Sequence, residues 1–392
     1  MQILYLSALA SQKAIDEARE RDKSFCGFAI QKFGRLLTEG FAANGCEVTA
    51  LSTFYLPKVG FYYHRKSENC NGVTYKYISS LSCGILRHIW LVITCFFRVL
   101  SFGLTQRKDK ALVCDVLNVS ACVGALAAAK LTRLRCVGLM TDMPGMLVYN
   151  NNTKETLSLS ARVNRRYLSQ FTHYIFMTEQ ANEAVNTKKR PYVVMEGCVD
   201  NRMGKHIEKQ TKEKRIIIYA GGLYERYGLK MLVDGFIKAD VKESELWLYG
   251  DGHYVEELKA IQQRDSRIRY YGIRPNDEIV DAEQKAVLLV NPRPTHEDFT
   301  KYSFPSKNME YMVSGTAVLT TRLPGMPEEY YPYVYLFDEE TTDGYAKTIR
   351  SVLSLPIEEL NRKGQEARQW VLDNKNNVAQ TANVLRLIEG LN

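Results

Sequence analysis

The chain has 392 residues, of which 45% are hydrophobic and 24% are charged, and its net charge is +8 at pH 7. This length exceeds the size at which one hydrophobic core keeps growing, so we expect two domains. The composition is that of a globular protein and excludes a disordered or fibrous chain. The positive charge suits an anionic partner, but no RNA- or DNA-binding motif is present, and we expect no nucleic-acid partner.

The nine cysteines are scattered along the chain, and no two of them have C-x-x-C spacing. An odd number of isolated cysteines favours buried thiols in a reducing compartment over disulfides or a zinc site. The first residues, Met1–Leu6, show no basic segment followed by an apolar stretch and a cleavage site. We therefore expect no secretory signal and a cytoplasmic location.

The N-terminal half begins as an α/β unit. Ile3–Leu6 is predicted to be a strand, and the turn after it is delayed by a charged insertion, Gln12–Lys23. Apolar residues at helical spacing then predict a helix over 29–44, which Gly45 ends, and Glu47–Ser52 is the next expected strand.

The C-terminal half repeats this order more clearly. Strand Ile216–Tyr219 is followed by the turn Gly221-Gly222 and by a helix over Gly228–Lys238. Further strands are expected at 246–249, 268–271, 286–290, 317–320 and 334–337, with helices at 255–263 and 306–314. Strands that are buried on both faces and separated by helices predict parallel, doubly wound sheets. We expect one Rossmann-like domain over 1–195 and a second over 196–375, with the linker near 196–214.

The segment Phe304–Met312 is the most informative for function. Pro305 precedes a helical pattern and Ser306 is a good N-cap, so the helix begins with free backbone N–H groups at the carboxyl edge of the sheet. Such a helix end binds phosphate, and ligands of open α/β sheets bind at this edge. Glu310 lies one turn further, where its carboxylate can accept hydrogen bonds from a ribose. The alternative is that Ser306 only caps the helix and Glu310 only complements its dipole.

This segment resembles the donor-site helix of the family 4 glycosyltransferases of GT-B fold, in their bacterial polysaccharide subgroup. The matching residues are Pro305-Ser306-Lys307-x-x-Glu310-Tyr311-Met312-x-Ser314-Gly315-Thr316-x-Val318. The same subgroup is resembled at 196–200, 219–223, 227–229, 249–252 and 323–330. The resemblance implies two Rossmann-like domains facing a central cleft, and a closing helix, about 376–392, that packs back on the first domain.

The resemblance also implies a donor site on the second domain. The residues that we assign to it are Gly221, Gly222, Arg226, Lys230, Gly250, Arg293, Tyr302, Phe304, Pro305, Ser306, Lys307 and Glu310. Glu310 matches the second glutamate of the family's E-x7-E motif and is expected to contact the ribose of the donor. The first glutamate is replaced by Tyr302, and Glu297 lies five residues earlier.

The sequence departs from the family a second time at the first turn of this domain. Gly222 and Tyr227 stand where the family commonly has an arginine and a lysine that serve the diphosphate. Because losing both charges would weaken donor binding, we expect Arg226 or Arg293 to compensate.

On the acceptor side we expect Gly27 and Asp142 to contribute. Gly27 lies in the loop after the first strand, where a residue without Cβ permits close approach of a ligand. Asp142 follows the strand Cys136–Met140 and is a candidate to bind an acceptor hydroxyl or to act as a local base, although it also suits a turn before Pro144.

Two further features concern partners. The sequence has no Asp-x-Asp pair and no clustered His/Cys spacing, so we expect neither metal nor cofactor. The apolar stretch Leu81–Leu104, which contains Arg87, His88 and Arg98, is either a helix that contacts the membrane surface or a buried helix of the first domain.

Together these features predict a metal-independent glycosyltransferase that uses a nucleotide-sugar. The resemblance implies transfer with retention to a glycan or lipid-linked acceptor, in cell-surface polysaccharide synthesis at the inner face of the cell membrane. Two alternatives stay open. One is a non-catalytic GT-B module that binds a glycan or a partner, and the other is a nucleotide-sugar 2-epimerase on the same fold.

Overall fold

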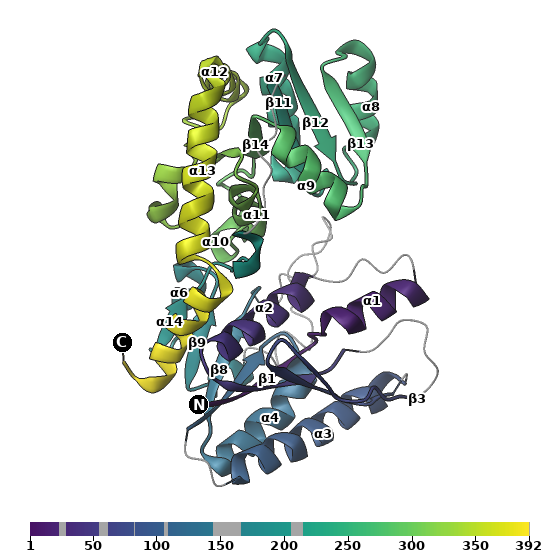
Figure 1. The fold of residues 1–392 in the computed structure, drawn as a ribbon, viewed down its shortest axis with the longest axis vertical. Helices are drawn as coiled ribbons and strands as arrows, with labels where there is room; N and C mark the ends of the chain where they lie inside the picture. Colours follow the sequence, from purple (N-terminus) through teal and green to yellow (C-terminus); the bar gives the residue numbers. More distant parts are fainter. Residues whose placement is uncertain are drawn as a thin grey trace. The chain divides into compact units, whose positions relative to one another are not determined.

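The computed structural model describes residues 1–22, 29–54, 62–81, 83–105, 109–143, 166–204 and 215–391. The chain forms two compact units, one of residues 1–198 with 376–392 and one of residues 199–375 (Figure 1). The boundary lies between Cys198 and Val199, three residues beyond the position expected from the sequence. The closing helix α14 (Asn377–Glu389) belongs to the first unit, where it packs on α2 (Ala29–Ala43).

In the described residues the first unit has a sheet of eight strands in the order β10-β9-β8-β7-β1-β2-β5-β4. The strands are β1 (Gln2–Ser7), β2 (Glu47–Ser52), β4 (Glu68–Cys70), β5 (Val73–Tyr77), β7 (Lys110–Asp115), β8 (Arg135–Met140), β9 (His173–Phe176) and β10 (Tyr192–Val194). All neighbours are parallel except β4 and β5. Two short strands, β3 (Tyr62–Tyr63) and β6 (Ser80–Leu81), pair separately.

Besides α2 and α14, the helices of this unit are α1 (Gln12–Arg21), α3 (Gly84–Leu104), α4 (Val119–Thr132) and α6 (Glu179–Val185). The sequence analysis identified Gln12–Lys23 only as a charged insertion and did not predict the helix α1 within it. Ala14, Ile15 and Ala18 bury one side of the helix, and the Ser11 hydroxyl caps it by accepting a hydrogen bond from the Ala14 N–H at 3.1 Å. The many charged residues of its outer side concealed this short apolar stripe.

In the part of the second unit that the structure describes, six parallel strands form a sheet in the order β13-β12-β11-β14-β15-β16. Its strands are β11 (Arg215–Ala220), β12 (Ser244–Tyr249), β13 (Ile268–Gly272), β14 (Leu288–Asn291), β15 (Ala317–Thr320) and β16 (Tyr335–Leu336). Its helices are α7 (Leu229–Ala239), α8 (Val255–Arg264), α9 (Asn276–Lys285), α10 (Phe299–Tyr302), α11 (Ser306–Ser314), α12 (Thr342–Ser354) and α13 (Ile357–Asn374), with short 3-10 helices η1 (Asn201–Gly204), η2 (Glu225–Tyr227) and η3 (Glu328–Tyr333). The strands and helices that the sequence predicted in this half begin and end within two residues of these bounds.

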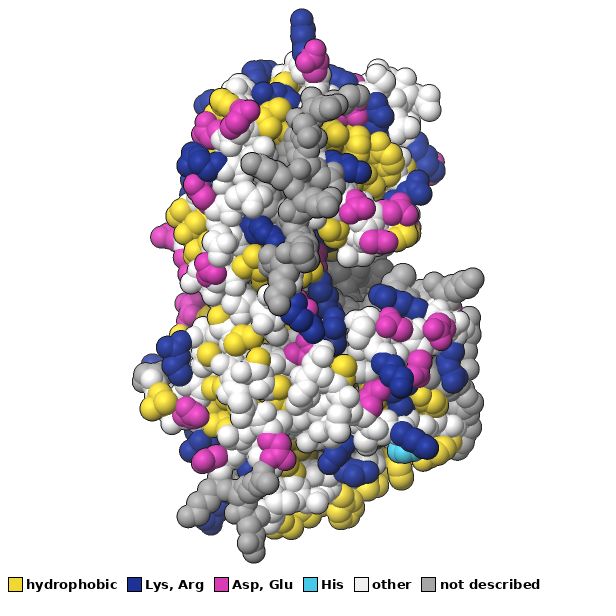
Figure 2. All heavy atoms as spheres, in the orientation of Figure 1, with side chains coloured by type: hydrophobic (Ala, Val, Ile, Leu, Met, Phe, Trp, Pro, Cys, Tyr) yellow, Lys and Arg dark blue, Asp and Glu magenta, His cyan; other side chains and the backbone are white. Residues whose placement is uncertain are grey.

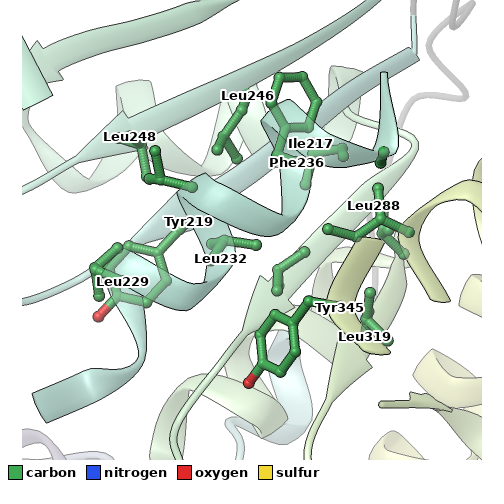
Figure 3. Close-up of a cluster of buried hydrophobic side chains, with 14 of the residues drawn as sticks. Ile217, Tyr219, Leu229, Leu232, Phe236, Leu246, Leu248, Leu288, Leu319 and Tyr345 are labelled. Carbon is green, nitrogen blue, oxygen red and sulfur yellow. The ribbon is translucent and has the colours of Figure 1, made fainter. Parts of the chain in front are cut away.

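Both faces of this second sheet are covered. On one face Ile217, Leu246 and Leu288 pack against Phe236 of α7 and Tyr345 of α12 (Figure 3). On the other, Ile218 and Leu289 pack with residues of α11 and α13. Double coverage explains why the strands read as continuous apolar runs rather than alternating ones. It also leaves the carboxyl edge of the sheet as the place where polar groups gather.

The strand order reverses between β11 and β14, and this reversal is the point at which doubly wound sheets bind ligands. Gly228, at the end of the loop after β11, has φ +82°, and a Cβ built on it would lie 1.9 Å from the carbonyl oxygen of Pro292, just after β14. Gly250 has φ +125°, and its Cβ would lie 1.8 Å from the carbonyl oxygen of Gly221. The loops after β11, β12 and β14 are therefore held together by backbone contacts that exclude a side chain.

We expect Gly228→Ala to lower the free energy of unfolding by about 2–4 kcal/mol, because alanine meets both an unfavourable φ and the Pro292 carbonyl. The matched control is Gly45→Ala, since Gly45 has φ +80° but nothing within 4 Å of its Cβ position. That control should cost only about 1 kcal/mol. Urea unfolding of both variants measures the difference, and equal costs would show that the close approach to Pro292 is unimportant.

Candidate functional site

An arginine–aromatic cluster lies at the reversal of the second sheet. Arg226, on η2, places its guanidinium 4.8 Å from the ring centre of Phe299. Arg293, two residues after β14, lies 5.1 Å from the ring centre of Tyr227 and 5.8 Å from that of Phe299. The two rings meet edge to face at 5.7 Å. Loops that follow β11 and β14 thus bring two cations together on one aromatic pair, and we call these four residues the arginine cluster.

The two arginines differ in their ionic partners. Arg226 pairs with the carboxylate of Glu297 at 3.4 Å. For Arg293, the described part of the chain offers no carboxylate within ion-pair distance. Stacking on a ring uses the flat face of a guanidinium and leaves its edge N–H groups for an anion. The arginine cluster therefore keeps a cationic group available at the place where this fold binds ligands.

The first turn of α11 is fixed beside this edge by a buried amide network. The Asn291 amide donates to Asn308 Oδ1 at 2.7 Å, and the Thr320 hydroxyl donates to the Asn291 carbonyl at 3.1 Å. These residues join the ends of β14 and β15 to α11. The sequence suggested Ser306 as the N-cap of α11, but the N-cap is Pro305. No side chain caps this end of the helix. The first-turn N–H groups are therefore not occupied by a capping side chain.

Charged side chains extend along α11 from its first turn. Lys307 and Glu310 form an ion pair at 3.4 Å, and both are partly exposed. Glu283 of α9 is buried nearby, and this burial raises the pKa of its carboxyl to about 7, although Lys307 lowers it and Glu310 raises it further. Glu283 was not predicted from the sequence, because nothing in its helical pattern shows that the side chain turns inward.

Three other predicted donor residues have different surroundings. Lys230 pairs with Asp234 at 3.2 Å and with Glu257 at 3.6 Å, so its charge is matched by carboxylates of α7 and α8. Phe304 is buried against Tyr330, with ring centres 5.1 Å apart, which makes it a core residue. Tyr302 ends α10 and is half-buried.

The glycines of the first turn allow close contacts between neighbouring loops. The Gly221 N–H donates to the Tyr249 carbonyl at 3.0 Å, and a Cβ on Gly222 would lie 2.9 Å from the ring of Tyr224. With Gly250 already in contact with Gly221, the three glycines allow the loops to approach each other. A bulkier residue at Gly222 therefore conflicts with this chain's own aromatic side chains.

A second polar group lies at the strand-order reversal of the first sheet, between β1 and β7. Ser7 ends β1 and donates its hydroxyl to Asp115 Oδ2 at 3.2 Å, while the Leu117 N–H donates to Asp115 Oδ1 at 3.1 Å. Burial raises the pKa of Asp115 to about 6, and the charge of Asp142 contributes to the rise. Asp142 itself is exposed after β8. Gly27, the other acceptor-side candidate, lies outside the described residues.

Sequence reasoning selected Asp142 and missed Asp115. The signal was present, because Asp115 is a charged residue that ends the otherwise apolar run Ala111–Cys114. A charged residue at the end of a parallel strand lies at the carboxyl edge of the sheet, where open α/β sheets bind their ligands.

Comparison with known proteins agrees with this architecture. Residues 214–354 match the family described as Glycosyl transferases group 1. The matched segment contains the arginine cluster, the glycine turns and α11. Comparison with curated protein sequences gives no match.

Several solved structures are similar over the whole chain. Sucrose-phosphate synthase from Thermosynechococcus elongatus is 14% identical with a TM-score of 0.67, covering 100% of this chain and 99% of that one. Anabaena HepE in complex with UDP is 13% identical with a TM-score of 0.63, and both chains are covered completely. The lipopolysaccharide outer core galactosyltransferase WaaB is 14% identical with a TM-score of 0.60, also with complete coverage of both. The fold is GT-B.

The raised pKa of Asp115 predicts a pH-dependent stability. Its folded value is about 6 against an ordinary 3.8, so the folded chain holds a proton that the unfolded chain has lost, and the free energy of unfolding falls as pH rises between these values. We expect Asp115→Asn to remove this loss and to stabilise the protein by about 1–3 kcal/mol at pH 8 but little at pH 4. Denaturant unfolding at both pH values measures it. Asp338→Asn, at an exposed position of the second unit, is the control, and equal behaviour of the two variants would contradict the assignment.

Proposed function

We propose that the protein is a glycosyltransferase that moves a sugar from a nucleotide-sugar donor to a hydroxyl of a glycan or lipid-linked saccharide. The arginine cluster at the strand-order reversal of the second sheet carries this proposal. It lies in the segment that matches the glycosyltransferase family, and it supplies positive charge where the sequence lacks the family's usual arginine and lysine.

The donor diphosphate binds to this cluster and to the first turn of α11. As the bond between sugar and diphosphate breaks, negative charge grows on the leaving diphosphate. Arg293 and the backbone N–H groups of α11 stabilise that charge. Because protein cations and helix dipoles supply the positive charge, the proposal includes transfer without a metal ion. The incoming diphosphate repels the carboxylate of Glu297 and competes with it for Arg226. The ion pair between Arg226 and Glu297 therefore opens when the donor binds.

Glu310 receives the ribose hydroxyls of the donor. It lies one turn into α11, and its resemblance to the second glutamate of E-x7-E supports this role. Lys307 pairs with its carboxylate at 3.4 Å, and this contact orients the side chain. The UDP and UDP-glucose bound in the Anabaena HepE structures support uridine nucleotides as the first donors to test.

The first unit presents the acceptor. Asp142 and Asp115 are two carboxylates at its carboxyl edge, and we assign acceptor hydroxyl binding to Asp142 because it is exposed. Resemblance of α11 to family 4 enzymes supports transfer with retention of the anomeric configuration, in which the acceptor hydroxyl approaches on the face that the diphosphate leaves. The same resemblance supports a role in cell-surface polysaccharide synthesis at the inner face of the membrane.

A non-catalytic module is the second candidate, and one observation favours it. Gly222, Tyr227 and Tyr302 replace three residues that are charged in the family, and Glu297 occupies one of the two arginines of the cluster. Turnover of a donor separates the candidates, because a binding module releases no nucleoside diphosphate from a nucleotide-sugar. Anomeric analysis of the product by NMR then tests retention.

Nucleoside diphosphates are expected to stabilise the protein through the arginine cluster. At about 100 times Kd the free energy of unfolding rises by about 2.7 kcal/mol, which is visible as a raised melting temperature. Arg293→Ala removes a charge-assisted bond and should raise Kd by about 10- to 100-fold. Arg362→Ala is the control, because Arg362 pairs with Glu366 on the exposed side of α13. An unchanged Kd in Arg293→Ala would place the diphosphate elsewhere.

Glu310 is expected to recognise the nucleoside and not the phosphates. Glu310→Gln should weaken binding of UDP by about 5- to 20-fold, since charged hydrogen bonds are worth about 1–2 kcal/mol more than neutral ones. Binding of inorganic pyrophosphate should not weaken. Calorimetric titration of both ligands gives the comparison, with Glu366→Gln as control. Equal weakening for UDP and pyrophosphate would show that Glu310 acts through the phosphates.

A further inference from the structure

Helix α3 of the first unit carries a large exposed apolar surface. Its side chains Leu91, Cys95 and Val99 are buried, and the helix packs on α4. On its remaining surface Ile85 is 75% exposed, Phe97 61% and Leu104 70%. The exposed apolar side chains of this surface, which we call the α3 face, are Ile85, Leu86, Ile89, Trp90, Ile93, Phe97 and Leu104. The sequence left open whether this stretch is buried, and the structure excludes that alternative.

The α3 face is continuous along the helix. Ile85, Ile89, Ile93 and Phe97 follow each other at intervals of four residues, which places them on one side of a helix. Twenty-one residues extend over about 30 Å. Figure 1 places α3 at the outer edge of the first unit, and Figure 2 shows hydrophobic side chains along that edge. A shallow hollow in it is lined by Phe97, Leu100, Ser101, Leu104 and Thr105. An apolar surface of this extent indicates an interaction site.

The charged residues of α3 and α4 are all of one sign. Residues 84–105 and 119–135, which cover α3, α4 and the turn after α4, contain no aspartate or glutamate. Their charged residues are Arg87, Arg98, Lys130, Arg133 and Arg135. Arg98 is exposed next to Phe97, at the border between the apolar stripe and the buried side of the helix. An apolar helix face bordered by arginines is the pattern of a helix that lies in a membrane interface and meets anionic headgroups.

We infer that the α3 face docks on the surface of an anionic lipid bilayer, with its apolar side chains at the boundary of headgroups and acyl chains. This inference deepens the proposed function, because it places the acceptor-binding unit at the surface where a lipid-linked saccharide would be found. A second copy of the chain fits less well, since a two-fold contact through this face would bring the same cations together without any acidic partner on α3 or α4.

Docking parallel to the surface follows from the packing of α3. By length and composition alone, among the described residues, this helix is apolar enough to cross a membrane. However, a Cβ on Gly124 of α4 would lie 2.1 Å from the Val92 carbonyl oxygen, and one on Gly103 would lie 2.4 Å from Thr132 Oγ1. The two helices touch through these glycines along their length. Spanning the bilayer would require α3 to leave α4 and its buried residues.

Vesicle sedimentation of the full chain tests this inference. At low salt the protein should bind vesicles of equal parts phosphatidylglycerol and phosphatidylcholine, and bind pure phosphatidylcholine much more weakly. Ile93→Ser/Phe97→Ser should reduce binding to the anionic vesicles by about tenfold or more, and Arg98→Gln by about fivefold. Ile237→Ser/Leu391→Ser is the matched control, because these exposed apolar residues lie on α7 and after α14.

The outcomes are separable from those of the proposed function. The rise in melting temperature on adding UDP is measured on the same variants and should equal that of the unmodified protein. Vesicle binding is measured without UDP, so it can be interpreted even if UDP does not bind. Three results would overturn the inference: equal binding to both kinds of vesicle, binding that Ile93→Ser/Phe97→Ser does not affect, or a dimer in solution that this variant converts to a monomer without vesicle binding. Resistance of bound protein to alkaline carbonate extraction would show insertion across the bilayer instead.

Discussion

The close approach of Gly228 to the Pro292 carbonyl is the constraint on which the arginine cluster depends. It brings the loop after β11 against the end of β14, and these two loops carry Arg226 and Arg293. Two guanidinium groups repel each other. A rigid backbone that holds them in place and an attractive contact for each of them are needed to offset this repulsion. Tyr227 and Phe299 supply that contact through their ring faces. The positive charge at this edge is therefore a property of the loop packing as much as of the arginines themselves.

The two sheets use the same topology with opposite chemistry. In each, the strand order reverses next to the first strand of the unit, which opens a place for polar groups at the carboxyl edge. In the second unit this place holds arginines and the first turn of α11, which favour an anion. In the first it holds Asp115, Ser7 and the exposed Asp142, which favour hydroxyl donors. A reaction between an anionic donor and a hydroxyl acceptor needs this division of charge.

Burial acts differently on the cations and the carboxylates of these edges. Asp115 and Glu283 are buried without a cation paired to them in the described part of the chain, so burial raises the pKa of each into the range between about 6 and 7. The two arginines instead lie against the rings of Tyr227 and Phe299, which attract a cation. On α3 the reverse is found, because apolar side chains are exposed to solvent and Arg98 lies at the border of this exposed surface. Such a surface is costly in solution, and a lipid interface removes that cost.

From the sequence alone follow the two α/β halves and, in the second unit, the bounds of the strands and of α7, α8 and α11. The sequence also predicts phosphate binding at the start of α11 and compensation by Arg226 or Arg293. These follow from local rules: apolar periodicity, glycine turns, and Pro305 at the start of a helix. The folded structure was needed to establish that α1 is a helix, that Phe304 belongs to the core, that carboxylates of α7 and α8 match Lys230, and that Asp115 and Glu283 are buried. It also decided that α3 is exposed. The reason is physical, since burial and pairing depend on residues distant in sequence, and a helical pattern alone does not say what covers its apolar side.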